Sequence, residues 1–503
     1  MIQELIEKIK NFININDFSN AKKLLDTIKN EDNPLILYYR GFTNHKLGNN
    51  KEAIKNLKKI KTEIPEVFFL MANILEDLSK ELDAIKYLEK TVSLKPKYWQ
   101  AFFNLGKLYL KIKEFEKSKE FFKEVLKIDP NNTKSMHYLG VLYAKTKDLV
   151  KAQKQLEKVL SIDPNNEKSH MELSEILLGT GNLKYGWEEY MWKFNYLENV
   201  YPEQIKKIPI WDGKNIEKNT FLIFREQGFG DEVLYASCYN NLIRKAKKCV
   251  FISDDRLVNL FKNSFPKANF IGEKIFSKNT DLSQINPSAR LQAPMIPKFF
   301  RNKFSDFPKQ KKYLIPKKIN EERWKKKLLK YKKKLKIGLA WKSSSELNNK
   351  IEKRQEEKNS LKEPIFFDLN EWKDFLSIEN ICLINLMYDC AKKEINEFNL
   401  SAKSKIINFD DLDLKNEIDD VAALITNLDI VISAQTWIGD FSAALGVEVY
   451  KFHNIYSKTR LGQKNIPWNN SIIFETKNGN WKDSFKLIKS LLNNKKRKLI
   501  NIK

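Results

Sequence analysis

Residues 221–234 read Phe-Leu-Ile-Phe-Arg-Glu-Gln-Gly-Phe-Gly-Asp-Glu-Val-Leu. The opening apolar run predicts a buried strand, the glycines predict a turn, and the acidic residues predict the first turn of a helix. Junctions of this kind lie at the edge of an α/β sheet, where backbone N–H groups converge and ligands bind. The stretch therefore places one carboxylate, Asp231, at a ligand-binding edge, and Gly228 and Gly230 shape a loop that is open to a ligand.

Downstream of this junction, apolar strands and amphipathic helices alternate. Runs at 249–252 and 269–271 predict further strands of a first sheet, and a proline-dotted stretch from 287 to 314 predicts less regular structure. A second block has predicted strands at 336–340, 381–386, 406–408, 429–433 and 447–450. Such alternation predicts parallel sheets covered by helices. We expect two Rossmann-like domains, residues 217–318 and 319–503, that face each other across a cleft.

The N-terminal part carries an internal repeat. Pro96, Pro130 and Pro164 are 34 residues apart, and Ile-Asp-Pro-Asn-Asn surrounds each of the last two prolines. This period predicts paired helices, each pair too small to bury its apolar face alone. Gly106 and Gly140 fall at the same position in successive units, where two helices must approach closely.

These residues resemble the tetratricopeptide repeat. The resemblance implies an all-α superhelix over residues 1–196 that binds extended peptides or docks on a neighbouring domain. Residues 197–216, with Trp211-Asp212-Gly213, are predicted to form a short linker ordered by its aromatic residues.

The composition narrows the class of protein. Four cysteines form no Cys-x-x-Cys pair and four histidines show no metal-ligand spacing, so we expect no structural zinc and a reduced, cytoplasmic setting. No apolar run approaches the ~20 residues of a membrane span, which leaves only peripheral membrane contact open. The formal charge of +26 suggests nucleic-acid binding as a possible function. Because lysine is spread through the whole chain, we expect the densest cluster, 309–336, to be a solvated helix face, with an anionic partner as the alternative.

Further landmarks occur in a fixed order. The aromatic segment 186–192 and Trp211-Asp212-Gly213 precede the junction, and Gly-Leu-Ala-Trp-Lys-Ser at 338–343, Ile-Asp-Asp-Val at 418–421 and Val-Ile-Ser-Ala-Gln-Thr at 431–436 follow it. Together they resemble bacterial proteins that join tetratricopeptide repeats to a GT-B glycosyltransferase domain related to the heptosyltransferases of glycosyltransferase family 9. The resemblance implies a GT-B fold and transfer of a sugar from a nucleotide-sugar donor to a protein or glycan acceptor. It also implies inversion at the anomeric centre, with no metal or other cofactor.

The resemblance assigns roles to residues in both α/β domains. It implies that Asp231 is the general base, for which a helix N-cap is the alternative. In the second domain it implies a nucleotide-sugar site, whose residues share a place at the carboxyl ends of strands: Lys342, Ser343, Ser344, Thr436 and Gly439. A lysine with hydroxyls suits a diphosphate clamp, and the start of a helix suits an anion. A surface lysine, an N-cap threonine and a glycine for close packing are the alternatives.

Two features depart from the family pattern, and a third segment resembles a metal site of other transferases. Asp440 stands where relatives usually carry His, and its charge would repel a phosphate if unscreened. The charged stretch 345–359 is longer than the family loop. Asp411-Leu412-Asp413 has the Asp-x-Asp spacing of metal-dependent transferases, but those have another fold. The alternative function is therefore a non-catalytic tetratricopeptide scaffold for protein–protein interaction with a degenerate transferase domain.

Overall fold

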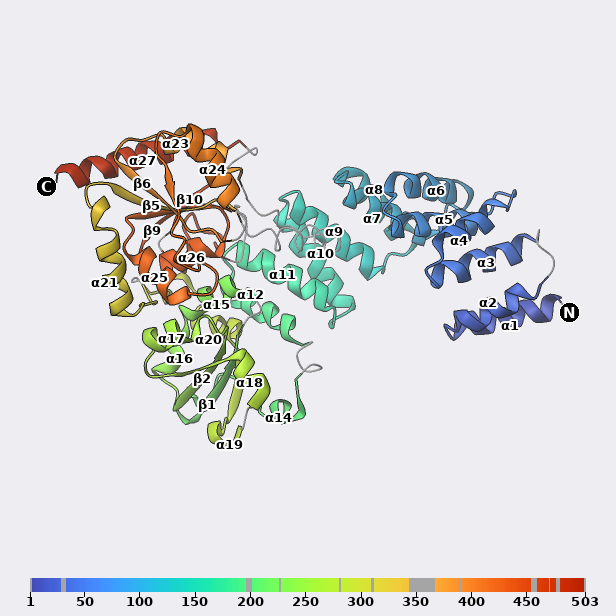
Figure 1. The fold of residues 1–503 in the computed structure, drawn as a ribbon. Helices are drawn as coiled ribbons and strands as arrows, with labels where there is room; N and C mark the ends of the chain where they lie inside the picture. Colours follow the sequence, from blue (N-terminus) through green and yellow to red (C-terminus); the bar gives the residue numbers. More distant parts are fainter. Residues whose placement is uncertain are drawn as a thin grey trace. The chain divides into compact units, whose positions relative to one another are not determined.

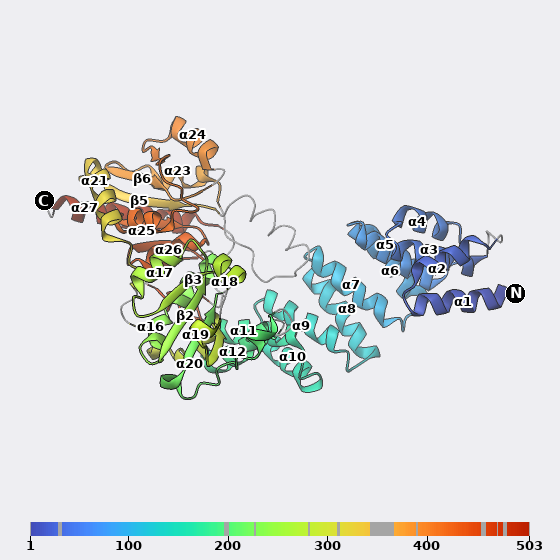
Figure 2. The ribbon, with the colours of Figure 1, turned by 60° about the horizontal axis from the view of Figure 1, so that its bottom comes forward.

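The computed structural model describes residues 2–28, 33–195, 201–225, 228–279, 282–308, 312–342, 367–388, 391–453, 459–469, 471–475 and 480–501. The chain divides into two compact units, Met1–Asn166 and Glu167–Lys503. Figures 1 and 2 show the ribbon from two directions.

The first unit is built from helices that pack in successive pairs (Figure 1). Their bounds are α1 (Ile2–Asn14), α2 (Phe18–Asp26), α3 (Pro34–Lys46), α4 (Asn50–Lys58), α5 (Pro65–Asp77), α6 (Glu81–Leu94), α7 (Trp99–Lys111), α8 (Phe115–Ile128), α9 (Thr133–Lys145) and α10 (Leu149–Ile162). Each partner contributes an apolar face to the space between the helices, as the repeat pattern predicts.

Small residues set the closeness of each pair. A Cβ atom added at Gly106 would lie 2.8 Å from the Phe122 ring, and one added at Gly140 would lie 2.8 Å from Leu156 Cγ. Ser118 fits the same gap, because its buried hydroxyl donates to the Gly106 carbonyl at 2.6 Å. The predicted role of the two glycines is confirmed.

The second unit contains two parallel sheets. The first has the order β3-β2-β1-β4, from β1 (Thr220–Phe224), β2 (Lys248–Ser253), β3 (Asn269–Gly272) and β4 (Ala289–Gln292). The second has the order β10-β9-β8-β5-β6-β7, from β5 (Leu335–Ala340), β6 (Ile381–Asn385), β7 (Ile406–Ile407), β8 (Ile430–Ser433), β9 (Glu448–Phe452) and β10 (Ile472–Phe474). All pairings are parallel, so the predicted parallel sheets are confirmed. The stretch expected to be less regular contains β4.

Helices surround both sheets, and Figure 2 shows α27 along the second sheet. The longer ones are α11 (Glu167–Gly179), α12 (Leu183–Tyr190), α15 (Phe229–Ala236), α17 (Val258–Ser264), α18 (Glu273–Asn279), α21 (Lys318–Lys327), α24 (Ala391–Ser401), α25 (Ile418–Thr426), α26 (Trp437–Ala444) and α27 (Lys482–Asn501). Shorter ones are α14 (Glu203–Lys206), α16 (Tyr239–Ile243), α19 (Leu282–Ile285), α20 (Ile296–Phe300), α23 (Lys373–Leu376) and the 3-10 turns η1 (Met191–Phe194), η2 (Ile216–Lys218), η3 (Ala293–Met295), η4 (Phe304–Asp306), η5 (Leu329–Tyr331) and η6 (Leu369–Trp372).

The last helices of the predicted repeat array, α11 and α12, belong to the second unit. The indole of Trp187 on α12 is fully buried and donates to the Arg301 carbonyl at 2.9 Å. Within the described part of the predicted linker, the Trp211 backbone N–H donates to the Arg290 carbonyl of β4 at 3.0 Å. One hydrophobic core therefore runs from α12 through both sheets.

The strand order locates the ligand-binding edges. In each sheet the first strand in the sequence, β1 or β5, lies between the second and the fourth. The six-stranded order is that of a doubly wound dinucleotide-binding sheet, in which ligands bind at the carboxyl ends of the strands where the order reverses. Those points are the β1/β4 and β5/β8 neighbours.

Candidate functional site

Asp231 lies in the first turn of α15, directly after β1. The N-cap position is taken by Gly228, whose backbone is extended (φ −89°, ψ 129°). Asp231 is half-buried, and its Oδ2 atom would lie 3.7 Å from a Cβ added at Gly228. The alternative reading of Asp231 as a helix N-cap is therefore wrong, because the helix begins two residues before it.

Gly230 shapes a contact between helices instead of an open space. A Cβ added there would lie 2.9 Å from Trp437 Cβ. The Phe229 ring meets the Trp437 indole edge-on, with centroids 4.5 Å apart. Since Trp437 is the first residue of α26, the first turns of α15 and α26 pack against each other (Figure 1).

The second-sheet edge carries Thr436 and Gly439. Thr436 is the N-cap residue of α26 and is buried, and its hydroxyl lies 3.0 Å from the Ser433 hydroxyl. A Cβ added at Gly439 would lie 3.0 Å from Ser433 Oγ and 3.3 Å from Lys451 Cδ. Gly439 therefore lets α26 lie close on β8 and β9.

Lys342 is oriented toward a different helix. Its ammonium forms an ion pair with Glu394 of α24, and the Trp341 indole donates to the same carboxylate at 2.6 Å. Thr436 follows β8, whereas α24 follows β6, on the other side of β5. Ser343, Ser344 and the charged stretch 345–359 lie outside the described residues.

The negative charge of Asp440 is compensated. Lys451 Nζ lies 2.5 Å from Asp440 Oδ2, and Asn469 donates to Asp440 Oδ1 at 3.1 Å. Only 2% of the Lys451 side chain is exposed, so the pair is screened little by solvent. Lys451 therefore supplies a positive charge that compensates Asp440, the residue that departs from the family pattern.

A polar pocket of about 350 Å³ lies at the carboxyl ends of β6 and β7. We call it the second-sheet pocket; its lining includes Asn385, Tyr388, Lys392, Asn408, Phe409, Asp410, Asp413, Lys415 and Asn416. Asn385 is fixed at its base by donating to the Met387 carbonyl and to Asn408 Oδ1, both at 2.9 Å. Sequence reasoning missed this pocket, although an asparagine at the carboxyl end of each of two predicted strands was the available signal.

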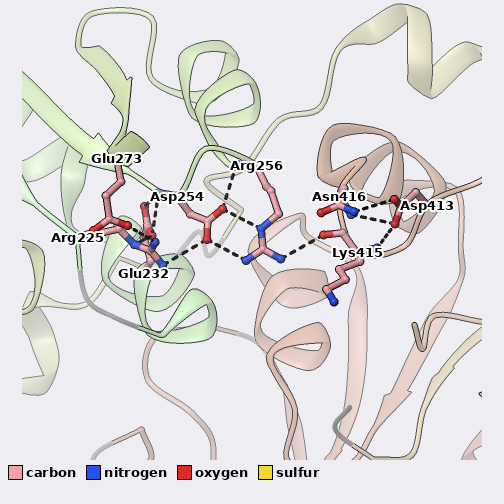
Figure 3. Close-up of polar contacts among 8 residues, drawn as sticks. All are labelled: Arg225, Glu232, Asp254, Arg256, Glu273, Asp413, Lys415 and Asn416. Atoms are coloured by element: carbon pink, nitrogen blue, oxygen red, sulfur yellow. Dashed lines mark hydrogen bonds and ion pairs between the residues drawn. The ribbon is translucent and has the colours of Figure 1, made fainter. Parts of the chain in front are cut away.

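Asp413 orders one wall of that pocket. Its Oδ1 accepts hydrogen bonds from the Lys415 N–H at 2.9 Å and the Asn416 N–H at 3.1 Å, and its Oδ2 accepts one from the Asn416 side chain at 2.8 Å (Figure 3). Asp411 forms an ion pair with Lys327. In the Asp-x-Asp segment, Asp413 therefore stabilises a turn and Asp411 forms an ion pair. No group of three or more His, Cys, Asp or Glu side chains that could hold a metal occurs within the described ranges.

A network of charged groups lies beside Asp231. Arg225 Nε is 2.8 Å from Glu232 Oε2, and Arg225 also pairs with Asp254 at 3.4 Å and Glu273 at 3.0 Å (Figure 3). The Asp254 N–H donates to both Glu232 oxygens at 3.2 and 3.3 Å. Arg256 donates to Asp254 through two nitrogens, each at 2.8 Å.

Burial sets the protonation of Glu232. The side chain has no exposed surface, and burial raises the pKa of Glu232 to about 8, an effect that Arg225 only partly offsets. Burial alone would also raise the pKa of Asp254, but its bonds with Arg256 and the charge of Arg225 lower that pKa overall.

A second, apolar pocket of about 210 Å³ lies where β1 and β4 end. Its walls include Phe194, Trp211, Phe224, Met295 and Phe299. This pocket was not predictable from the sequence, since these residues come from four separate segments.

Comparisons with known proteins support the prediction of tetratricopeptide repeats in the N-terminal region. Two tetratricopeptide-repeat profiles match residues 99–132 and 121–154, and such repeats suggest a protein partner. Protein FlbA of Caulobacter vibrioides is 27% identical over 312 residues, which cover 59% of this chain and 50% of FlbA. The chain thus spans about half the length of that relative. Because the first unit ends at Asn166, about a third of the way along, the similarity to FlbA extends into the second unit.

Solved structures match the chain over a limited part. MamA from Desulfovibrio magneticus RS-1 has 23% identity and a TM-score of 0.30, with 32% of this chain and 93% of that chain covered. The structure titled for Pseudomonas aeruginosa pilF has 16% identity and a TM-score of 0.36, with 41% and 93% covered. These likenesses concern the fold alone. Separately, none of the helices in the described ranges combines the length and the apolar character needed to cross a membrane.

Proposed function

We propose that this protein is a GT-B glycosyltransferase that moves a sugar from a nucleotide-sugar donor to an acceptor hydroxyl, with the repeats recruiting a protein or glycan acceptor. The observation that carries the proposal is the contact between α15 and α26. It joins the first turn that holds Asp231 to the first turn that follows Thr436. A carboxylate next to an anion-binding helix start is what transfer from a nucleotide requires.

The donor would lie along the carboxyl edge of the second sheet. The second-sheet pocket, at about 350 Å³, is within the usual size of ligand sites and offers Tyr388 and Phe409 to a nucleoside. The diphosphate would lie at the start of α26, whose N–H groups and dipole favour an anion. Since only β5 separates β6 from β8, the two features are roughly 10 Å apart at the usual strand spacing.

The chemistry follows from these positions. Asp231 would take the proton of the acceptor hydroxyl, and the acceptor oxygen would attack the anomeric carbon from the face opposite the leaving group. The bond between that carbon and the phosphate oxygen would break, and the nucleoside diphosphate would leave with the bonding electrons. The anomeric configuration is thereby inverted. The Asp440–Lys451 pair supports the proposal, because it leaves no net charge to repel the diphosphate.

The test is release of nucleoside diphosphate from a panel of UDP-, GDP-, CDP- and ADP-sugars. We expect release by the wild type with at least one donor and a loss of 10²-fold or more in Asp231→Asn, the usual contribution of a general base. Asp212→Asn is the control, because that exposed aspartate lies in the loop before β1. Equal release by wild type and Asp231→Asn would refute the assignment of the base.

A second function is favoured by the Lys342–Glu394 ion pair. A lysine already paired with a carboxylate is a poor diphosphate clamp, as expected for a non-catalytic tetratricopeptide scaffold with a degenerate transferase domain. Calorimetry separates the two functions. A scaffold binds its protein partner and none of the four nucleoside diphosphates, whereas the proposed enzyme binds at least one of them.

A further inference from the structure

Arg256 connects the two sheets at the candidate site. It follows β2, and its guanidinium makes a two-pronged contact with Asp254, with both distances at 2.8 Å. Its third nitrogen, Nη1, donates to the Lys415 carbonyl at 3.2 Å. Figure 3 shows the side chain reaching from Asp254 to Lys415. One side chain therefore joins the first-sheet edge to the second-sheet pocket.

The guanidinium of Arg256 contacts a hydrogen-bonded turn at Lys415. Lys415 lies in the turn that Asp413 holds with three hydrogen bonds, and Asp413, Lys415 and Asn416 all line the second-sheet pocket. A ligand that contacts this turn would therefore act directly on the carbonyl that Arg256 binds.

The other side of Arg256 contacts the first turn of α15, which carries Asp231. The guanidinium lies over the Phe229 ring, 4.7 Å from its centroid, and Phe229 is two residues before Asp231. Asp254, which Arg256 orients, donates its N–H to Glu232, the residue after Asp231. Arg256 thus contacts the start of α15 through a cation–π contact and, through Asp254, a hydrogen bond.

We propose that Arg256 is a positioning residue that couples binding of a nucleoside diphosphate at the second-sheet pocket to the order of the first turn of α15, which carries Asp231. The identity of the ligand rests on the proposed function, whereas the link between the two segments rests on the contacts of Arg256. Lysine cannot replace this side chain, because a single ammonium cannot make the two-pronged contact with Asp254 and also reach Lys415.

The test is amide hydrogen exchange of the full-length chain, measured for wild type, Arg256→Met, Arg256→Lys and a control. Arg323→Met is the matched control, since Arg323 also pairs with a carboxylate, Asp420, but both lie on the second-sheet side. Without ligand we expect Arg256→Met to speed exchange several-fold in peptides covering both 229–236 and 413–416, and Arg323→Met to change neither.

The second arm adds whichever of UDP, GDP, CDP and ADP binds the wild type by calorimetry. Because coupling between sites is reciprocal, we expect that nucleotide to slow exchange at 229–236 in the wild type and in Arg323→Met but not in Arg256→Met. We also expect at least fivefold weaker binding to Arg256→Met. Equal protection of 229–236 in wild type and Arg256→Met would overturn the coupling.

The two proposals fail separately. If none of the four nucleotides binds, the proposed function fails, and the exchange of the ligand-free proteins still decides whether Arg256 links the two segments. Unchanged exchange at either segment in Arg256→Met overturns the link. If Arg256→Met does not fold, the same comparisons are made with Arg256→Lys, for which we expect a smaller change in the same direction at both segments.

Discussion

Asp231 and Glu232 are neighbours in the sequence, yet the helix gives their carboxylates different surroundings. Asp231 is half-buried in the first turn of α15, whereas Glu232 is fully buried against Arg225 and the Asp254 backbone. The sequence predicts both at the start of a helix, but it does not predict that Glu232 is fully buried. The difference arises because Asp254 and Arg225 converge on Glu232 from two other positions in the fold.

The raised pKa of Glu232 predicts a pH dependence of stability. The unfolded chain loses this proton near pH 4.5 and the folded chain near pH 8. The stability contributed by the protonated form is therefore fully present below pH 4.5 and is lost as the pH rises through 8. Between these limits the free energy of unfolding should fall by up to about 1.4 kcal/mol per pH unit from this one group.

Glu232→Gln removes the ionisable carboxyl group. It should therefore remove this group's contribution to the pH dependence of the free energy of unfolding. The measurement is chemical denaturation at pH 5, 6, 7 and 8, which gives the difference in the free energy of unfolding between wild type and Glu232→Gln at each pH. We expect wild type to lose stability relative to Glu232→Gln as the pH rises. The control is Glu217→Gln on η2, an exposed position, which should follow the wild type. Parallel curves for wild type and Glu232→Gln would contradict the raised pKa.

For Lys342, the position along the chain could be predicted from the sequence, but the ion-pair partner could not. Its place two residues after the end of β5 was predictable from the apolar run that precedes it. Its ion pair with Glu394 was not, because the two residues are 52 positions apart and only the packing of α24 brings them together. The same holds for Lys451, which compensates Asp440 from the neighbouring strand β9.

At the scale of elements, the packing of α15 on α26 depends on Gly230. A methyl group at this position would lie 2.9 Å from Trp437 Cβ, so the helices must separate. We expect Gly230→Ala to lower the free energy of unfolding by about 1–3 kcal/mol, the usual cost of overpacking. The measurement is denaturant unfolding followed by tryptophan fluorescence.

Gly228→Ala is the matched control for this prediction. Its φ of −89° suits any residue, and an added Cβ would make only an ordinary contact of 3.7 Å with Asp231. We expect a smaller loss than for Gly230→Ala, of at most about 1 kcal/mol, which arises because alanine is a poorer N-cap than glycine. Equal effects of the two alanine substitutions would show that Gly230 does not control the contact between the helices.

Most strands were predictable because their apolar runs are continuous and fully buried, as in β1 and β8. Two strands were not predicted: β10, which has only three residues, and β4, which has only four residues and includes Arg290. Arg290 is 5% exposed, and its guanidinium donates to the Ile208 carbonyl at 2.8 Å. A buried arginine with a distant backbone partner hides the strand from a hydrophobicity pattern.

At the scale of the whole molecule, the chain has two compact units, and the predicted end of the repeat array at residue 196 lies within the second one. The reason is physical. α12 has the helical pattern of a repeat, but its Trp187 is buried with residues of the α/β region, including Trp468. The period of a repeat predicts where helices form. It does not predict in which hydrophobic core the last helix is buried.

Separate cores predict separate responses to mutation. Gly140→Ala would place a methyl group 2.8 Å from Leu156 in the first unit. We expect it to lower the midpoint of one calorimetric unfolding transition by a few degrees, since about 1 kcal/mol shifts the Tm of a domain of this size by roughly 2–4 °C. The other transition should stay unchanged. Equal shifts in both would contradict two independent units.

The central claim is that the two sheet edges form one transferase site, and a crystal structure with a bound nucleoside diphosphate tests it most directly. We predict the nucleoside in the second-sheet pocket beside Tyr388, the diphosphate at the N–H groups that follow Thr436, and Asp231 on the side of the terminal phosphate. A nucleotide bound elsewhere, or one whose phosphates point away from α26 and Asp231, would contradict the account.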